Sequence, residues 1–236
     1  MQITMIGHST VLIETGGQKI LTDPYFGAWG NLAYARVAPP AKTREELGDV
    51  NLVLISHNHW DHTDRPFLRA LGADVPVLAP SWASWETKLR GARAPIVMKA
   101  WEQQRFGAVT VTAVPAVHLA VTTGYVVECQ ARQVYFAGDT YYGPFMKVIG
   151  RRFRLDVALL PVTTYRLPMT MGEESAVRAV QDLKPVVVIP IHLGVRPRSP
   201  LLRTSETAEG FARRAKEAGL EAQVVILSEG ESYRHE

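Results

Sequence analysis

The chain has 236 residues, of which 47% are hydrophobic and 21% are charged, and its formal net charge is +3. This length allows one or two domains, and the hydrophobic fraction excludes a disordered or collagen-like chain. No apolar run approaches the roughly 18 residues that a membrane span requires. The first residues alternate between apolar and polar without the basic segment and apolar stretch of a secretion signal. We therefore expect a cytoplasmic protein without a transmembrane segment.

Histidine is the unusual component of this composition. Cys129 is the only cysteine, which excludes a disulfide framework and a zinc finger built from thiolates, and we expect it to be a small buried residue. The seven histidines are His8, His57, His59, His62, His118, His192 and His235. Three of them fall within six residues. The positive charge is mild and scattered and forms no long basic stripe, so we expect no nucleic-acid partner.

The N-terminal part predicts an antiparallel meander, because short runs of strand character are separated by glycine-containing turns. Its strands are predicted at Ile3–Ile6, Val11–Glu14 and Lys19–Thr22. A long loop is predicted from Tyr25 to Gly48. Its aromatic residues fit a lid over a site, a hydrophobic substrate surface or an interface in a homo-oligomer.

Strands and helices alternate from residue 51 onwards. Strands are predicted at Asn51–Ser56, Val75–Ala79, Ile96–Lys99, Ala108–Val114, Gly124–Cys129, Gln133–Ala137, Leu155–Pro161, Val186–Ile191 and Ala222–Leu227. Helices are predicted over Asp64–Leu71, Ser81–Arg90, Met171–Leu183 and Ser205–Ala218. Thr170 and Glu173 have the spacing of a capping box at the start of the third helix. One layered α/β sandwich, forming a single domain over residues 1–236, accommodates both halves.

The segment that carries chemistry is Ser56-His57-Asn58-His59-Trp60-Asp61-His62-Thr63-Asp64, directly after an apolar strand. Side chains alternate in extended backbone, so His57, His59 and Asp61 start on one side. The bend into the next helix can bring His62 beside them. Imidazole and carboxylate groups at this density suit Zn²⁺. A lone His-x-His is weak evidence, but the additional Asp-His in the same frame favours a metal site over core packing.

Three further residues share the placement of His57. His118, Asp139 and His192 each follow an apolar run that has strand character. Ligands at the ends of neighbouring strands converge on one edge of a sheet. Each of these residues alone would more often be structural, and their shared placement makes them candidate ligands.

These motifs resemble the metallo-β-lactamase superfamily. The resemblance is carried by His57-x-His59-x-Asp61-His62, followed in order by His118, Asp139 and His192. Further matches are Gly7-His8-Ser9-Thr10, Leu21-Thr22-Asp23-Pro24, Ala137-Gly138-Asp139-Thr140 and Pro190-Ile191-His192. They are similar to the branch with ascorbate-6-phosphate lactonase, N-acylphosphatidylethanolamine-hydrolysing phospholipase D and the UPF0173 metal-dependent hydrolases. The sequence departs from the phospholipase-like relatives at Thr170, where they often carry His.

The resemblance implies a four-layer αββα sandwich with two metals between the sheets. It assigns His57, His59 and His118 to one metal. Asp61, His62 and His192 would bind the other metal, and Asp139 would bridge both. The resemblance also implies that Asp23 orients a ligand histidine; the residues alone leave open a turn role before Pro24.

The expected activity is metal-dependent hydrolysis of a small anionic substrate. Two divalent ions, zinc first and manganese or iron as alternatives, would activate a bridging hydroxide against an ester-type bond, either a phosphodiester or a lactone. Asp61 and Asp139 are the candidate catalytic residues. The alternatives are a di-iron redox protein and a non-enzymatic metal-binding protein on the same fold. His8 is expected either to contact substrate or to make a buried structural hydrogen bond, and His235 is expected in a frayed terminus without a role.

Overall fold

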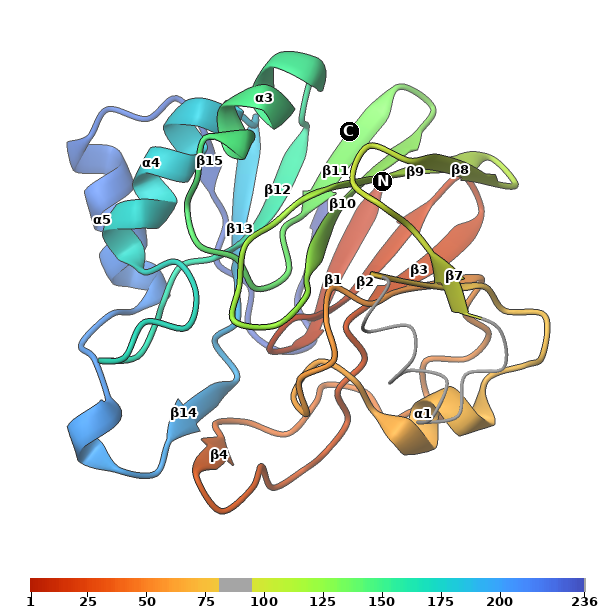
Figure 1. The fold of residues 1–236 in the computed structure, drawn as a ribbon, viewed down its shortest axis with the longest axis horizontal. Helices are drawn as coiled ribbons and strands as arrows, with labels where there is room; N and C mark the ends of the chain where they lie inside the picture. The colour runs from red at the N-terminus through yellow and green to blue at the C-terminus, as the bar shows by residue number, and fades with distance from the viewer. Residues whose placement is uncertain (81–94, 236) are drawn as a thin grey trace.

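Two mixed β-sheets pack face to face, and helices cover their outer faces (Figure 1). The computed structural model describes residues 1–80 and 95–235. The predicted αββα sandwich is confirmed. The predicted helix over Ser81–Arg90 lies outside the described residues. Within the two described ranges, no helix has the length and apolar character needed to cross a membrane.

The first sheet combines an antiparallel and a parallel half. Its strands, in spatial order, are β16 (Ser232–Arg234), β1 (Gln2–Gly7), β2 (Thr10–Thr15), β3 (Gln18–Thr22), β5 (Leu52–Leu54), β6 (Val77–Ala79) and β7 (Pro95–Val97). The predicted meander is the antiparallel β1-β2-β3 unit. From β3 to β7 the neighbours are parallel, so their connections must cross over the sheet.

The second sheet repeats this division. Its order is β15 (Gln223–Val224), β13 (Val187–Ile191), β12 (Val157–Pro161), β11 (Arg132–Phe136), β10 (Thr123–Cys129), β9 (Val109–Pro115) and β8 (Gln103–Phe106). Strands β8 to β11 are antiparallel to one another, whereas β11, β12, β13 and β15 are parallel. The two sheets therefore have the same mixed construction.

Alternating side chains of each strand fill different layers. In β13, Val187, Ile189 and Ile191 join the central core between the sheets, whereas Val188 packs into the cluster beneath the helices. Strand β12 has the same alternation. Strands buried on both faces read as continuous apolar runs, which explains why these two strands were predictable. Cys129 belongs to the central core, as expected for a small buried residue.

The helices complete the parallel connections. Their bounds are α1 (Arg65–Ala70), α3 (Phe145–Arg152), α4 (Glu173–Leu183) and α5 (Ala208–Glu217), with a short 3₁₀ helix at Pro200–Leu202. Helices α3, α4 and α5 lie together on the second sheet, and α1 lies on the other side of the molecule (Figure 1). Helix α1 is capped by Asp64, whose Oδ1 accepts a hydrogen bond from the Phe67 amide at 2.8 Å.

The predicted start of α4 was wrong. The helix begins at Glu173, and the amide of its N-cap Gly172 donates to Ser175 Oγ at 3.0 Å. Thr170 does not cap the helix, because its hydroxyl binds the backbone of Thr140. The Glu173 side chain instead accepts from the Thr207 amide and from Arg214 Nε. The capping spacing was present, but both side chains have tertiary partners.

The predicted long loop after β3 contains a short strand. Strand β4 (Tyr34–Arg36) pairs with β14 (Val195–Pro197) in an antiparallel two-stranded ribbon. Arg36 secures the loop, because its guanidinium donates to the carbonyl oxygens of Tyr25, Gly27 and Ala38. The loop thus follows one defined path over the protein.

The expectation of a frayed C-terminal end was also wrong. Strand β16 pairs with β1, the His235 amide donates to the Met1 carbonyl at 3.0 Å, and His235 Nε2 lies 3.1 Å from Asp156 Oδ1. His235 therefore has a structural role: it fastens the C-terminal end to residues that are distant in the sequence.

Helix α3 packs on α4 through a glycine, and this contact generates a prediction. A Cβ at Gly150 would overlap with the Asp182 carbonyl oxygen and lie 2.8 Å from the Leu183 Cα. We expect Gly150→Ala to lower the free energy of unfolding by about 1–3 kcal/mol, because backbone atoms cannot yield as a flexible side chain can. Urea denaturation measures the change. Gly72→Ala is the control, because its nearest neighbour would be a side-chain atom at 3.7 Å. Equal stability of the two variants would contradict this packing.

Candidate metal centre

The ends of strands from both sheets deliver the predicted site residues to one place. His8 follows β1, Asp23 follows β3, and the segment from His57 to His62 follows β5 in the first sheet. His118, Asp139 and His192 follow β9, β11 and β13 of the second sheet. The carboxyl ends of parallel strands meet at the same edge, so residues far apart in sequence become neighbours.

Asp139 lies at the centre of the histidine cluster. Its Oδ2 lies 3.2 Å from His192 Nε2 and 3.5 Å from His62 Nε2. The same oxygen lies 3.9 Å from His57 Nε2 and 3.9 Å from His118 Nε2. One carboxylate thus faces imidazoles that the family resemblance assigns to two different metals.

The remaining predicted ligands flank this centre on two sides. On one side, the Nε2 of His118 and the Nδ1 of His59 are 3.2 Å apart, and both residues group with His57. On the other side, Asp61 groups with His62 and His192. The structure therefore brings all seven predicted ligand residues together, in two groups that share Asp139.

A second buried carboxylate orients the cluster from behind. Asp23 has no exposed surface, and its Oδ2 lies 2.6 Å from His62 Nδ1 and 2.5 Å from Ser56 Oγ. The Ser56 hydroxyl in turn lies 2.9 Å from His57 Nδ1. The Nδ1 atoms of His57 and His62, which face away from Asp139, therefore both have hydrogen-bond partners. The Asp23 side chain thus contacts the cluster, in addition to any role of this residue in the turn before Pro24. Ser56 is a further site residue, which sequence analysis quoted only as part of a motif.

The turn that carries Asp139 depends on close packing. Gly138 has a φ of +58°, and a Cβ there would overlap with the Ser56 side chain, so glycine is required for both reasons. The Thr170 hydroxyl accepts from the Thr140 amide at 3.1 Å and donates to the Thr140 carbonyl at 3.0 Å. Thr170, noted above as a departure from relatives, fastens the turn next to Asp139.

Burial and neighbouring charges set the protonation states. Burial lowers the pKa of His57 well below its usual value and that of His118 to about 4. Burial also opposes charge on His62, but Asp139 and Asp23 raise the pKa of His62 well above its usual value. Burial disfavours the charge of Asp139 as well, yet His192 and His62 keep its pKa well below normal. The cluster thus contains uncharged imidazoles that offer lone pairs, next to ionised carboxylate.

Aromatic side chains continue from the histidine cluster towards the surface. Tyr25 contacts His8, with ring centroids 6.2 Å apart, and Tyr165 contacts His192 at 6.3 Å. Between these two tyrosines, further ring contacts run through Trp60 and Tyr34 at 5.4–6.2 Å. Trp29 of the same loop is 84% exposed. Whether the loop acts as a lid or an interface stays a prediction.

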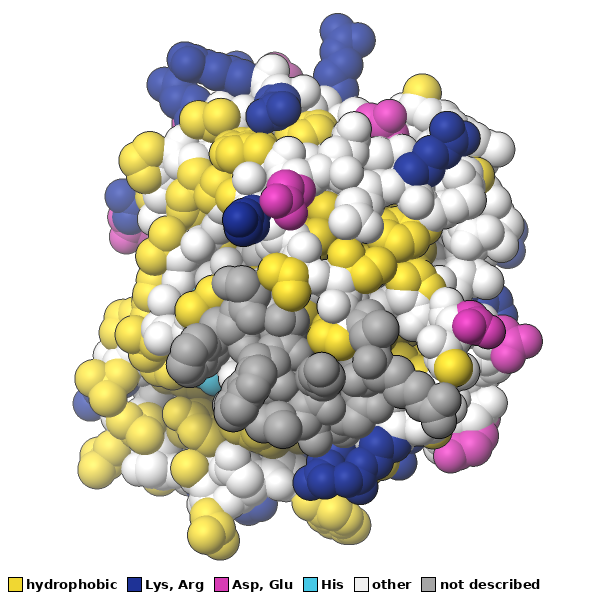
Figure 2. Space-filling model, turned by 45° about the vertical axis from the view of Figure 1, so that its right-hand side comes forward, with side chains coloured by type: hydrophobic (Ala, Val, Ile, Leu, Met, Phe, Trp, Pro, Cys, Tyr) yellow, Lys and Arg dark blue, Asp and Glu magenta, His cyan; other side chains and the backbone are white. Residues whose placement is uncertain are grey.

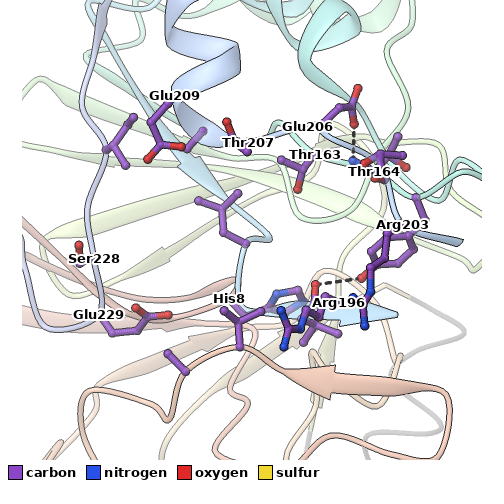
Figure 3. Close-up of a pocket in the computed structure, with 18 of the residues that line it drawn as sticks. His8, Thr163, Thr164, Arg196, Arg203, Glu206, Thr207, Glu209, Ser228 and Glu229 are labelled. Atoms are coloured by element: carbon purple, nitrogen blue, oxygen red, sulfur yellow. Dashed lines mark hydrogen bonds between the residues drawn. The ribbon is translucent and has the colours of Figure 1, made fainter. Parts of the chain in front are cut away.

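A cavity borders His8 on the side of α5. It has a volume of about 510 Å³ and is lined by His8, Tyr165, Val195 and the start of α5, among others (Figure 3). Of the clustered histidines only His8 borders it, and the His8 side chain has no exposed surface. On the face in Figure 2, histidine contributes one small patch of surface next to hydrophobic side chains. His8 therefore lies between this cavity and the other clustered histidines.

Comparison with known proteins identifies the family. A family model described as "Beta-lactamase superfamily domain" matches residues 18–193. A UPF0173 metal-dependent hydrolase from Methanopyrus kandleri is 34% identical over 254 residues, which cover 99% of each chain. Another from Pelotomaculum thermopropionicum is 36% identical over 98% of this chain and 99% of its own. The chain belongs to the metallo-β-lactamase superfamily. Within it, the chain is a metal-dependent hydrolase of the UPF0173 type, which confirms the predicted resemblance.

Solved structures agree with this assignment. Igni18, a metallo hydrolase from the hyperthermophilic archaeon Ignicoccus hospitalis, superimposes with a TM-score of 0.80. The two chains are 25% identical, and the match covers 100% of this hydrolase and 99% of Igni18. The αββα sandwich is therefore shared over the full length.

The contacts of Asp23 in this hydrolase predict its importance for metal binding. We expect Asp23→Asn to lower metal affinity about 10–100-fold, because outer carboxylates fix the tautomer and orientation of ligand imidazoles. An amide accepts through one oxygen only, whereas Asp23 contacts His62, the Ser56 hydroxyl and the Ser56 amide. Competition with a chromophoric chelator measures the affinity.

Asp156→Asn is the matched control for Asp23→Asn. Asp156 also contacts three partners, the Gln133 amide, Arg132 and His235, but none belongs to the metal cluster. Wild-type metal affinity in Asp23→Asn would show that this carboxylate does not support the ligands.

Proposed function

We propose that this chain is a dinuclear metal-dependent hydrolase that cleaves an ester-type bond, a phosphodiester or a lactone, in a small anionic substrate. The observation that carries the proposal is the position of Asp139 Oδ2, which lies within 3.2–3.9 Å of four imidazole nitrogens. A single buried carboxylate between two groups of histidines is suited to bridge two cations.

The ligand assignment follows the two groups. We assign His57, His59 and His118 to one metal and Asp61, His62 and His192 to the other, with Asp139 shared. The 3.5 Å between His62 Nε2 and Asp139 Oδ2 is a separation that two ligands bound to one ion at about 2.0–2.2 Å can have. The Nε2 atoms of His57 and His62 are buried without hydrogen-bond partners among the described residues. Unsatisfied buried nitrogens that face a shared carboxylate support a cation between them.

The chemistry of the donors favours hydrolysis. When bound, two divalent metals would supply a hydroxide nucleophile near neutral pH and charge stabilisation for the developing oxyanion. Asp61 and Asp139 bring two negative charges against the four positive charges of two such ions, so the centre stays positive and favours an anionic substrate. Asp23 and Ser56 hold the imidazoles in place during turnover. A cysteine nucleophile has no part, because Cys129 is buried in the core.

Zinc is the metal we propose first, because imidazole with carboxylate suits it, and manganese and iron use the same donors. Elemental analysis of protein purified without added metal distinguishes these ions. The same measurement separates a zinc hydrolase from a di-iron redox protein, which would contain two iron atoms per chain and support electron transfer.

Asp139→Ala tests the shared carboxylate. We expect this variant to lose metal and to lower turnover by more than about 100-fold, because a shared ligand affects both ions directly and even outer-sphere partners cost 10–100-fold. Elemental analysis and turnover are measured on the same sample. Asp182→Ala is the control, because the Asp182 carboxylate accepts a hydrogen bond from Tyr142 Oη on the outer face, away from the metal cluster. Full metal content and activity in Asp139→Ala would refute the assignment.

A substrate panel decides the bond type. We expect cleavage of simple phosphodiesters or lactones by the metal-loaded chain and none after metal removal, since the chain would lack its nucleophile. Esters and β-lactams complete the panel as competing bond types. Metal-dependent cleavage confined to β-lactams would contradict the proposed bond type. Metal binding without cleavage of any member would favour a non-enzymatic metal-binding protein.

A further inference from the structure

His8 occupies a rigid position beside the second ligand group. It lies in the tight turn between β1 and β2, with a φ of +60° that few non-glycine residues adopt. Its carbonyl accepts a hydrogen bond from the His192 amide at 3.1 Å. Gly194 packs so closely that a Cβ there would lie 2.8 Å from the backbone nitrogen of His8. The β1–β2 turn of the first sheet therefore packs tightly against the loop that follows β13 in the second sheet.

The His8 ring lies among the candidate ligands of the second metal. Its centroid is 4.3 Å from that of His192 and 5.2 Å from that of His62. Its Nε2 lies 3.4 Å from Asp61 Oδ2, a separation that two ligands bound to one ion at about 2.0–2.2 Å can have. One ligand atom each of His8, Asp61, His62 and His192 lies within 4.8 Å of the other three.

The ring nitrogens of His8 are unsatisfied. Its side chain has no exposed surface, and neither nitrogen has a hydrogen-bond partner in the described part of the chain. Buried polar groups without partners are unfavourable, and strained backbone persists where the surrounding structure enforces it. His192, an assigned ligand, has a similar φ of +65°. The two residues face each other from opposite sheets, with the same strained backbone.

We propose that His8 Nε2 is a ligand of the second metal, beside Asp61, His62 and His192. This inference rests on the proposed dinuclear centre and adds a residue to it. The first metal would have three imidazoles and a share of Asp139. The second would have three imidazoles, the Asp61 carboxylate and a share of Asp139. The two positions are therefore unequal in the number of protein ligands that they offer.

Cobalt titration of the metal-free chain tests the role of His8. Visible absorption of Co²⁺ depends on its coordination number, so it reports ligand loss without any substrate. In His8→Asn, we expect one of the two ions to bind at least about tenfold more weakly, with an altered spectrum, and the other ion to be unaffected. Asparagine tolerates the left-handed backbone of this turn. His235→Asn is the matched control, because His235 contacts Asp156 outside the cluster.

His8→Gln separates a ligand from a hydrogen-bond donor. Glutamine can still donate to Asp61, but it offers no imidazole to the metal. Loss of affinity in both His8→Asn and His8→Gln supports the proposal. Wild-type affinity and spectrum in either variant would overturn it, leaving His8 as a partner of Asp61. If the wild type binds only one ion, the dinuclear centre itself fails, and the effect of His8→Asn on that ion's spectrum still decides whether His8 is a ligand.

A measurement on the wild-type chain covers the case in which the variants do not fold. Loading with ¹¹³Cd²⁺ and labelling histidine with ¹⁵N counts the metal-bound imidazoles through their scalar coupling. The proposal predicts six coupled histidines, namely the five assigned ligands and His8, with only His235 uncoupled. Five coupled histidines, with His8 uncoupled, would overturn it.

Discussion

The attraction between the buried carboxylate of Asp139 and the imidazoles around it is the interaction on which this site depends. A carboxylate that is 3% exposed cannot remain ionised without compensation. His62 lies between Asp139 and Asp23, and these two carboxylates raise the pKa of His62 well above its usual value, which favours a compensating positive charge there. A cation bound between the same groups would take over this role, so metal binding and proton release are linked.

That interaction requires both sheets at once. Asp139 and His192 come from the second sheet, whereas His57 and His62 come from the first. The central apolar core holds the two sheets against each other, so the packing of this core also positions the candidate ligands. Local strain collects at the same edge, where His8, Asp23 and His192 have positive φ without being glycine. Such strain persists where packing and hydrogen bonds over-determine the backbone.

Elements that depend on local sequence were predictable, whereas elements that depend on residues distant in the sequence were not. The apolar runs of β12 and β13 are strongly biased towards buried strands, and the motif from His57 to His62 is contiguous, so both were predictable. Strands β4, β14 and β16 are only three residues long, and their pairing depends on distant partners. Helix α3 contains Gly150, which weakens its helix propensity and makes sense only against α4.

Side-chain partners were harder to anticipate than backbone elements. Thr170 and Glu173 had the spacing of a cap, but each is engaged by a residue that is at least 30 positions away. Ser56 gave no signal beyond its place in a motif, because its role depends on Asp23, which precedes it by 33 residues. His8 stands alone in the sequence, and only the pairing of the β1–β2 turn with the loop after β13 places it near His192.

The two proposed metal positions share their support but not their surroundings. Asp23 contacts His62 directly and reaches His57 through Ser56, so one carboxylate orients an imidazole of each ligand group. Asp139 likewise faces both groups. A disturbance at either carboxylate must therefore affect both positions. His8 contacts only the Asp61 side, where Tyr25 and Tyr165 also approach the cluster. In the proposed centre, the asymmetry thus lies in residues such as His8 that border only one ligand group. Substitution of such a residue would alter one metal position and leave the contacts of Asp23 and Asp139 in place.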